Sequence, residues 1–484
     1  MMRKKTLETG KKSPGGRINL SLALIFLLFP AISLYAQVPP SAGSAESVEN
    51  TATEETPTVP AVQTDAIRPL SEERRDIIKY GLESELNVLL AALCNEKNDE
   101  FIDDFAQVLE KGAGVKTVQE IFNYFTIMDS DKGVEQAEKY LENYQEQSRD
   151  IIIAALRYLS SEKNHGFQEK IFPLLDSANA QITTAAVRYL GKRGNAESAG
   201  KLLELFEKEE TSQTLRGEII LALGELKDPE TVPFLKSLLE DEDEDTNLRR
   251  YACDSLGKIG DEQALPAIRA ALESPDNILR SYAISSLGYF PGEENATILL
   301  SALRDSFPRV RELAAQRLGD MEYKDAVSIL IYRARRDPDK KVRQAAIASL
   351  AKIGTGEAVS FLQEFFESEK NPGDLRSFAA EKLTDLHPSA MKESAAKIMD
   401  VEWTRDSSPI LDVIGRLVSQ KEYSGFDDLY KRMLGHQSFL IQIYAIRGIQ
   451  KNHISSLKAE VEALSAEGRH PQLRKNALSA LESL

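Results

Sequence analysis

The sequence predicts an all-α protein, a right-handed solenoid of stacked antiparallel helix pairs. Two observations support this. One helical phrase recurs at intervals of 31 to 34 residues, and every copy carries a leucine or isoleucine at the same position, called here the marker residue. A unit of this length forms two helices and cannot bury its apolar face alone, so neighbouring units must stack. The marker residues are Leu159, Leu190, Leu223, Leu256, Leu287, Leu318, Leu350, Leu383, Leu417, Ile449 and Leu481.

The composition fits such a fold and excludes some partners. Hydrophobic residues make up 42% of the 484 residues, enough for a continuous core, while aromatic residues make up 7%. The formal net charge is −16. A body this acidic repels the phosphate backbone of nucleic acids and anionic membrane surfaces. We therefore expect neither as a partner.

Residues 1–36 have the features of a secretory signal peptide. Basic residues end at Arg17, an apolar run covers 20–32, and Ala36 offers a small residue before a cleavage site. The apolar run is short for a membrane span. We expect export to the periplasm or the extracellular space, with an uncleaved N-terminal anchor as the alternative. Cleavage would remove six basic residues and one acid, leaving a charge of −21.

Three further segments follow. Residues 37–67 are rich in Pro, Thr, Ser and Glu without an apolar period, which predicts a disordered linker. Residues 68–147 have irregular helical spacing, which predicts about two divergent repeats that cap the array. Residues 148–484 contain the regular repeats. The whole array should hold about thirteen helix pairs, and no segment after the signal is expected to enter a membrane.

The repeated phrase has its own internal chemistry. In the six clearest copies an arginine begins the second helix, and a small or aliphatic residue three positions later faces a neighbouring helix. A glycine follows several marker residues, and we expect it to end or loosen the second helix. The arginines are Arg216, Arg249, Arg280, Arg311, Arg343 and Arg376, and the glycines are Gly191, Gly224, Gly257, Gly288 and Gly319.

The two cysteines do not predict a disulfide. Cys94 and Cys253 lie about five repeats apart, and a disulfide requires Cα atoms within about 7 Å. Cys253 occupies a position held by aliphatic residues in other units. Both are expected to be core residues.

The repeats resemble those of the HEAT-repeat family, in particular the HEAT-like repeats of the phycobilisome lyase type. The resemblance rests on LRRYACDSLGKIGDEQALPAIRAAL, residues 248–272, and on its neighbouring copies, and it covers about 148–484. It implies the solenoid fold. It implies little about function, because family members include scaffolds, lyase subunits and a few enzymes.

The resemblance also implies a role for some charged residues. HEAT repeats commonly pair an aspartate in the turn between helices with the arginine that begins the second helix. The expected role is a ladder of hydrogen bonds between adjacent units, interrupted where Glu210, Ser274 and Lys370 replace the aspartate. A ligand-binding row of arginines is the alternative. Here the aspartate lies six residues before the arginine in three units: Asp243 and Arg249, Asp305 and Arg311, Asp337 and Arg343.

The sequence carries no recognised motif for catalysis or for binding a metal or cofactor. Deoxyhypusine hydroxylase, a HEAT-like enzyme, binds iron through His-Glu pairs, but none of the five histidines here precedes a glutamate. Neither a phosphate-binding loop nor a nucleophile elbow occurs. The acidic run 240–245 is expected to be a solvated loop, with a calcium site as the less favoured interpretation. We predict no enzymatic activity and no cofactor.

The favoured function is therefore an exported, non-enzymatic scaffold or adaptor that binds a protein partner along the solenoid. Two alternatives remain open: a structural spacer of the cell envelope, and a relative of the lyases or metal-dependent hydroxylases. In solenoids the second helices usually line the concave face, where Tyr and Arg make good anchors. Packing between repeats is the competing explanation for these residues. The candidates are Arg157, Tyr158, Arg188, Tyr189, Tyr251 and Tyr282.

Overall fold

A computed structural model describes residues 69–161, 166–405 and 408–484. These ranges contain 26 α-helices, seven short 3-10 helices and no strand. The predicted signal peptide, residues 1–36, and the predicted linker, residues 37–67, lie outside the described ranges.

The 26 helices form thirteen pairs, in agreement with the predicted solenoid. In each pair an odd-numbered first helix precedes an even-numbered second helix. The first helices are α1 Leu70–Tyr80, α3 Ile102–Lys111, α5 Val134–Glu142, α7 Gln168–Ile171, α9 Ala196–Glu207, α11 Val232–Glu240, α13 Leu265–Ala270, α15 Glu293–Ala302, α17 Val327–Arg336, α19 Gly356–Glu367, α21 Pro388–Glu402, α23 Asp427–Leu434 and α25 Lys458–Leu464.

The second helices from α6 onward carry the repeated phrase. They are α2 Glu83–Glu96, α4 Val115–Ile127, α6 Arg149–Leu159, α8 Ala180–Arg193, α10 Gln213–Leu226, α12 Thr246–Ile259, α14 Asn277–Leu287, α16 Pro308–Asp320, α18 Lys340–Ile353, α20 Gly373–Leu386, α22 Pro409–Gln420, α24 Phe439–Lys451 and α26 Pro471–Leu481. The 3-10 helices are η1 Phe172–Asp176, η2 Pro229–Thr231, η3 Glu262–Ala264, η4 Ala271–Glu273, η5 Lys324–Ala326, η6 Ser424–Phe426 and η7 Ser455–Leu457.

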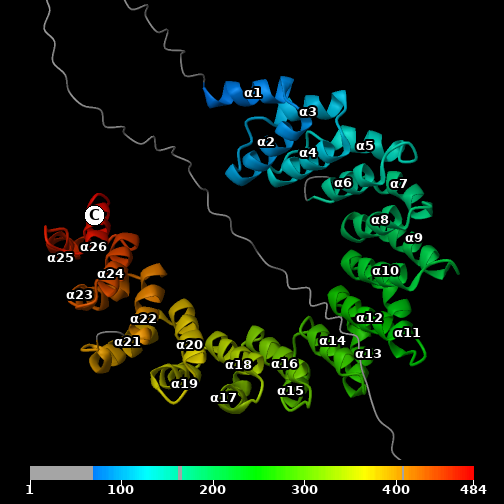
Figure 1. Cartoon of the computed structure of the whole chain (residues 1–484). Coiled ribbons are helices and arrows are strands. Elements are labelled where there is room, and N and C mark those ends of the chain that lie inside the picture. Colours follow the sequence, from blue (N-terminus) through cyan, green and yellow to red (C-terminus); the bar gives the residue numbers. More distant parts are fainter. Residues whose placement is uncertain (1–68, 162–165, 406–407) are drawn as a thin grey trace, which may run out of the picture. The chain divides into compact units, whose positions relative to one another are not determined.

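Within residues 69–484 the pairs follow one another in a curved row, with the second helices on the concave side and the first helices on the convex side (Figure 1). Each second helix packs against the second helix of the next unit, and most of these contacts are more extensive than those between successive first helices. The predicted boundary at 147/148 falls between α5 and α6, which pack together as the third pair.

The core runs along the row between the two layers. The marker residues are buried or nearly so, as are the small residues such as Ala252 and Ala283 that let the helices approach. Cys253 has no exposed surface. Turns between helices are fixed by aspartates that cap second helices, for example Asp245, whose carboxylate accepts hydrogen bonds from the backbone of Asn247 and Leu248. The acidic run therefore contributes a helix cap.

Four of the five glycines after marker residues have a different role from the predicted one of ending the helix. Gly191, Gly224, Gly257 and Gly319 lie inside their helices, whereas Gly288 is the C-cap residue that ends α14, as predicted. A Cβ at Gly257 would lie 2.6 Å from the Cβ of Ser286, on the next second helix. The glycines inside helices let consecutive second helices approach more closely than any side chain would permit.

A buried serine completes each of three such contacts. Its hydroxyl donates a hydrogen bond to a backbone carbonyl of the preceding second helix, because the missing Cβ of the glycine brings that helix within reach. The three bonds are Ser255 Oγ to Ile220 O at 2.8 Å, Ser286 Oγ to Cys253 O at 2.9 Å, and Ser349 Oγ to Ala315 O at 2.7 Å. We call this repeated arrangement the glycine–serine seam.

Candidate functional site

Two arginines that begin second helices bridge adjacent units. Arg280 donates two hydrogen bonds to the carboxylate of Asp305, both at 2.9 Å. Arg311 donates two to the carboxylate of Asp337, at 2.9 and 2.7 Å. In both cases the aspartate belongs to the unit after that of the arginine. Bidentate pairs of this kind fix the relative position of two units as well as attracting each other.

The register of this ladder differs from the pairing expected within one unit. Arg311 donates to the backbone carbonyl of Asp305 at 2.9 Å, while its charge partner is the later Asp337. The expected ion pairs of Asp243 with Arg249 and of Asp337 with Arg343 are absent among the described residues. The guanidinium of Arg311 spans the gap to the next unit, whereas those of Arg249 and Arg343 donate to backbone carbonyls of their own first helices.

Arginines without a following aspartate still have a common role. Arg249 donates to the carbonyl of Leu239 at 3.2 Å, and Arg343 to that of Ala334 at 3.0 Å. Both carbonyls lie in the last turn of a first helix, where free acceptors and the helix dipole favour a cation. In the following unit the aspartate position holds Ser274 and Lys370, respectively, so no carboxylate is available there.

Asp337 is the most deeply buried member of the ladder. Its side chain has no exposed surface, that of Arg311 is 7% exposed, and Arg333 makes a third contact at 3.2 Å. Burial by itself would raise the pKa of the Asp337 carboxyl. Hydrogen bonds from Arg311 and the backbone of Asp339, with the positive charges of Arg311 and Arg333, outweigh burial and hold the pKa below its ordinary value.

One bridging pair was missed by the sequence interpretation. Arg250 donates two hydrogen bonds to Asp276, at 2.8 and 3.1 Å, and Asp276 also caps α14. Arg250 lies one residue after the repeated arginine, so the periodic pattern gave no signal for it. The sequence evidence for this pair was the adjacent arginines Arg249 and Arg250. One guanidinium can bond the end of the first helix in its own unit, while the other reaches the next unit.

Among the candidate partner-binding residues, two tyrosines belong to the core. Tyr158 and Tyr189 are each 1% exposed. The ring of Tyr158 stacks on Phe122 with centroids 5.1 Å apart, and its hydroxyl donates to the carbonyl of Ser130 at 2.7 Å. Tyr251 and Tyr282 are half-buried and pack against the core. The packing explanation therefore holds for Tyr158 and Tyr189.

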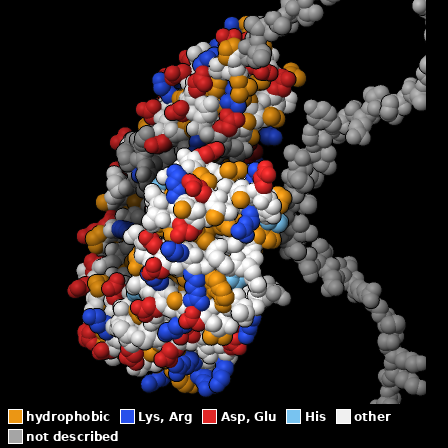
Figure 2. All heavy atoms as spheres, turned by 90° about the vertical axis from the view of Figure 1, so that its left-hand side faces the viewer, with side chains coloured by type: hydrophobic (Ala, Val, Ile, Leu, Met, Phe, Trp, Pro, Cys, Tyr) orange, Lys and Arg blue, Asp and Glu red, His pale blue; other side chains and the backbone are white. Residues whose placement is uncertain are grey.

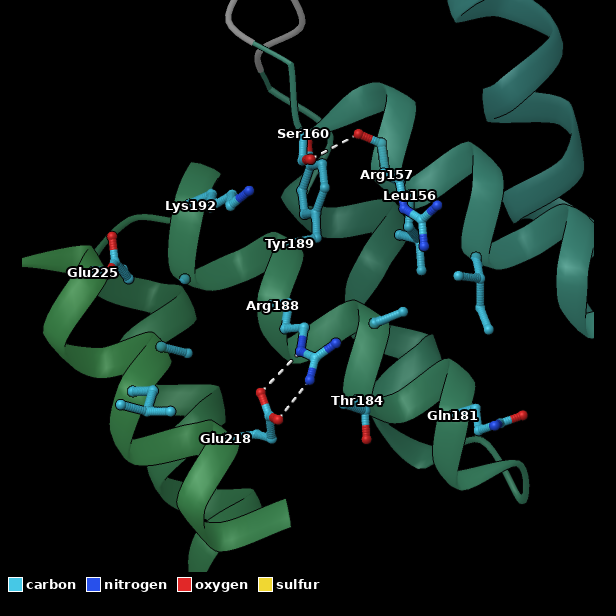
Figure 3. A pocket seen from close by; sticks show the side chains of 15 residues that line it. Leu156, Arg157, Ser160, Gln181, Thr184, Arg188, Tyr189, Lys192, Glu218 and Glu225 are labelled. Atoms are coloured by element: carbon cyan, nitrogen blue, oxygen red, sulfur yellow. Dashed lines mark hydrogen bonds and ion pairs between the residues drawn. The ribbon is translucent and has the colours of Figure 1, made fainter. Parts of the chain in front are cut away.

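The two candidate arginines are exposed on the concave side. Arg157 lies on α6, and Arg188 lies on α8, the next second helix along the row (Figure 3). The Arg188 guanidinium donates two hydrogen bonds to the Glu218 carboxylate on α10, at 2.9 and 2.6 Å. This ion pair keeps the guanidinium above the contact between α8 and α10.

Both arginines line one pocket, with a volume of about 630 Å³, between α6, α8 and α10. Its apolar wall includes Leu156, Ala185 and Leu221, and at its base Gly191 meets Ala222. Lys192, which the sequence interpretation did not include, also lines it. Volumes of this size are typical of ligand sites. The structure thus brings Arg157 and Arg188 to one recess and leaves Tyr251 and Tyr282 outside it.

Elsewhere, cations on second helices often pair with acids of the adjacent second helix. Lys258 on α12 contacts Glu225 on α10 at 2.8 Å, and Lys352 on α18 contacts Asp320 on α16 at 2.6 Å. On the face of the molecule seen in Figure 2, acidic and basic side chains are likewise interspersed. Such exposed ion pairs each contribute little to stability, but they leave positive and negative charge locally balanced on the surface.

Groups for metal or covalent chemistry do not gather in the described residues. No three His, Cys, Asp or Glu side chains there converge as metal ligands. His387 contacts the carbonyl of Ala351 at 2.7 Å, His470 stacks on Phe439, and His165 lies outside the described ranges. Within the same ranges, every helix is too short or too polar to cross a bilayer.

The two cysteines should differ in reactivity. Burial raises the pKa of the Cys253 thiol to about 12, and it also raises that of half-buried Cys94. Because the thiolate is the reactive form, Ellman's reagent is expected to titrate at most one thiol in the native protein, from Cys94, and two after denaturation. Rapid reaction of both thiols in the native state would contradict the buried position of Cys253.

Comparisons with known proteins identify the repeat family. The family model described as "Spirochaete HEAT repeat protein" matches residues 78–480. None of the curated proteins matches the chain. Among solved structures, the phycocyanin lyase complex of CpcE and CpcF from Nostoc sp. PCC7120 is 21% identical, with a TM-score of 0.31, over 48% of this chain and 94% of that one.

Two other solved structures are also similar to this chain. Human deoxyhypusine hydroxylase is 19% identical with a TM-score of 0.25, over 55% of this chain and 99% of that one. Kap95, in its complex with Nup1, is 14% identical with a TM-score of 0.45, over 85% of this chain and 73% of that one.

Proposed function

The chain belongs to the family of spirochaete HEAT repeat proteins, and from this premise we propose that it is an exported, non-enzymatic adaptor that holds a protein partner against its concave face. The observation that carries the proposal is the recess between α6, α8 and α10 on that face, where Arg157, Arg188 and Lys192 surround an apolar wall. Exposed arginines beside apolar surface are typical of protein-binding sites.

The rigidity of the face supports binding. The Arg188–Glu218 ion pair and the close contact of Gly191 with Ala222 join neighbouring second helices before any partner arrives. Little ordering entropy then opposes association, because the surface is already in its binding shape. The same argument applies along the row, since the second helices pack on one another throughout.

Two parts of the proposal rest on the sequence. Export rests on the basic and apolar segments of residues 1–36, and the absence of enzymatic activity on the lack of recognisable catalytic motifs. A chain of this kind would meet its partner outside the cytoplasm. It would act by geometry, bringing the partner to a defined place along the row.

Site-specific crosslinking in the exporting cell tests the proposal. A photoreactive benzoylphenylalanine replaces Gln181, exposed at the rim of the recess on α8, and in a second variant it replaces Glu197, exposed on the first helix α9. We expect one stoichiometric protein adduct from position 181 and none from position 197.

Two other outcomes would reject the adaptor function. Equal adducts at both positions would mean that the concave face is not the binding surface. Recovery of the protein with the wall or membrane, without a discrete adduct, would favour the alternative of an envelope spacer.

A further inference from the structure

The recess between α6, α8 and α10 has an unusual charge balance for this chain. Its charged lining consists of three cations and two acids, although the chain as a whole carries a net charge of −16. The cations are Arg157, Arg188 and Lys192, and the acids are Glu218 and Glu225. A locally positive rim attracts negative groups, whereas the net negative charge of the chain gives no general attraction for them.

Both acids of the recess are already engaged. Glu218 accepts the two hydrogen bonds of Arg188, and Glu225 contacts Lys258 at 2.8 Å. Arg157 and Lys192 are exposed, and neither side chain forms a hydrogen bond or ion pair with any residue in the described ranges. Two cations next to one recess are thus available to a ligand.

The apolar part of the recess lies directly beside these cations. Leu156 precedes Arg157 on α6, and Ala185 and Leu221 face the same space from α8 and α10. Two small residues, Gly191 and Ala222, also line the recess, and a Cβ at Gly191 would lie 2.8 Å from the Cα of Ala222. A bulky aliphatic or aromatic side chain can enter here with its polar neighbours still at the rim.

Arg157 also lines a second recess, of about 310 Å³, between α4 and α6, where the other charged lining residue is Glu120. The positive charge of the site is therefore concentrated at Arg157 and Lys192, on the side of the first recess. The two recesses share Ile153 as well, so they adjoin on the concave side. An occupant that spans both must be longer than one small molecule. This continuity favours an extended segment of a polypeptide.

We propose that this paired recess binds a short acidic peptide segment of the protein partner, with carboxylates of the segment at Arg157 and at Lys192 and an adjacent aliphatic or aromatic side chain against Leu156, Ala185 and Leu221. The inference rests on the proposed adaptor function and specifies the chemistry that the adaptor recognises. Guanidinium and ammonium groups supply the charge, and the apolar wall supplies the selectivity for the neighbouring residue.

The test uses a library of random dodecapeptides displayed on phage and selected on the full chain. Selected peptides are synthesised, and their affinity is measured by fluorescence anisotropy. We expect Asp or Glu next to Leu, Ile or Phe in these peptides. We also expect at least tenfold weaker binding by the Arg157→Glu, Lys192→Glu variant, and by wild type when the peptide acid is replaced with its amide.

A matched control separates local recognition from overall charge. The Lys341→Glu, Lys475→Glu variant changes the net charge equally, at exposed positions on α18 and α26, and should bind as wild type does. All substituted side chains are exposed, so the thermal midpoint should stay near that of wild type. Peptides without acids, equal loss in both double variants, or no selected peptide would overturn the inference.

Failure of the acidic-peptide inference can be distinguished from failure of the adaptor function. A protein adduct from position 181, together with no acidic peptide, would retain a concave-face adaptor and reject the acidic ligand. Absence of the adduct at that position would reject the adaptor function itself.

Discussion

Replacement of Asp337 by alanine is expected to lower the free energy of unfolding of the surrounding units by about 3–5 kcal/mol. The variant leaves Arg311 and Arg333, whose side chains are 7% and 15% exposed, without their buried carboxylate. It also removes the hydrogen bond that the carboxylate accepts from the backbone of Asp339 at 3.0 Å. Loss of one partner from a buried pair is costly because the other charge stays desolvated.

The measurement should report on local stability, because repeat arrays need not unfold in one step. Hydrogen exchange of the amides in α16 and α18 gives the local free energy directly. Asp428→Ala is the control, since that carboxylate is 89% exposed and contacts Lys392 at 3.3 Å. An effect of Asp337→Ala no larger than that of the control would mean that the ladder does not join the units.

Acid should weaken the same contacts. The pKa values of Asp276, Asp305 and Asp337 are all held below their ordinary range in the folded protein, in each case because arginine and backbone hydrogen bonds outweigh burial. Their contribution is therefore fully present above the pKa of an unfolded aspartate, about 3.9, and is lost as the pH falls through the lower folded values. In Asp337→Ala this acid-dependent loss should be smaller.

Replacement of Gly257 by alanine should cost about 1–3 kcal/mol, although alanine is the better helix former. The new Cβ would lie 2.6 Å from the side chain of Ser286 and 2.8 Å from its Cα. Relief requires that α12 and α14 separate, and this would break the bond from Ser286 to the carbonyl of Cys253. Denaturant unfolding, followed by circular dichroism, measures the loss.

Gly200 provides the matched control for that variant. It lies within α9, is exposed, and has no atom within 4 Å of the position that a Cβ would take. Gly200→Ala should therefore stabilise the helix by about 0.5–1 kcal/mol. In a Ser286→Gly background, Gly257→Ala should cost less than in wild type. Stabilisation by Gly257→Ala in the wild-type background would refute the close contact of the seam.

The repeat period was sufficient to predict the fold. The regular recurrence of the marker residues required a row of two-helix units, and the structure has thirteen such pairs. The role of the glycines could not be read from one helix alone. Gly224 faces Ser255 of the following unit. The close helix contact could therefore be predicted only from a glycine and a serine that recur together about 31 residues apart.

The candidate site was predicted only in part, and the reason lies in helix geometry. Arg157 and Tyr158 are adjacent in sequence, but one is exposed and the other is in the core, since successive residues point about 100° apart. Tyr158 precedes its marker residue directly, the position that Ser255 and Ser286 occupy in the seam. The position directly before the marker residue was therefore the sequence evidence that the side chain of Tyr158 is buried.

The glycine–serine seam has a mechanical consequence. The seam holds neighbouring second helices at nearly the smallest separation that two backbones allow, so the concave layer resists shortening. The first helices are less closely joined, so their spacing can change more easily. Small tilts shared among many units then change the curvature without breaking any one serine bond. Bending of the array would therefore change the spacing of the first helices more than that of the second helices, so the concave surface would keep its helix-to-helix spacing.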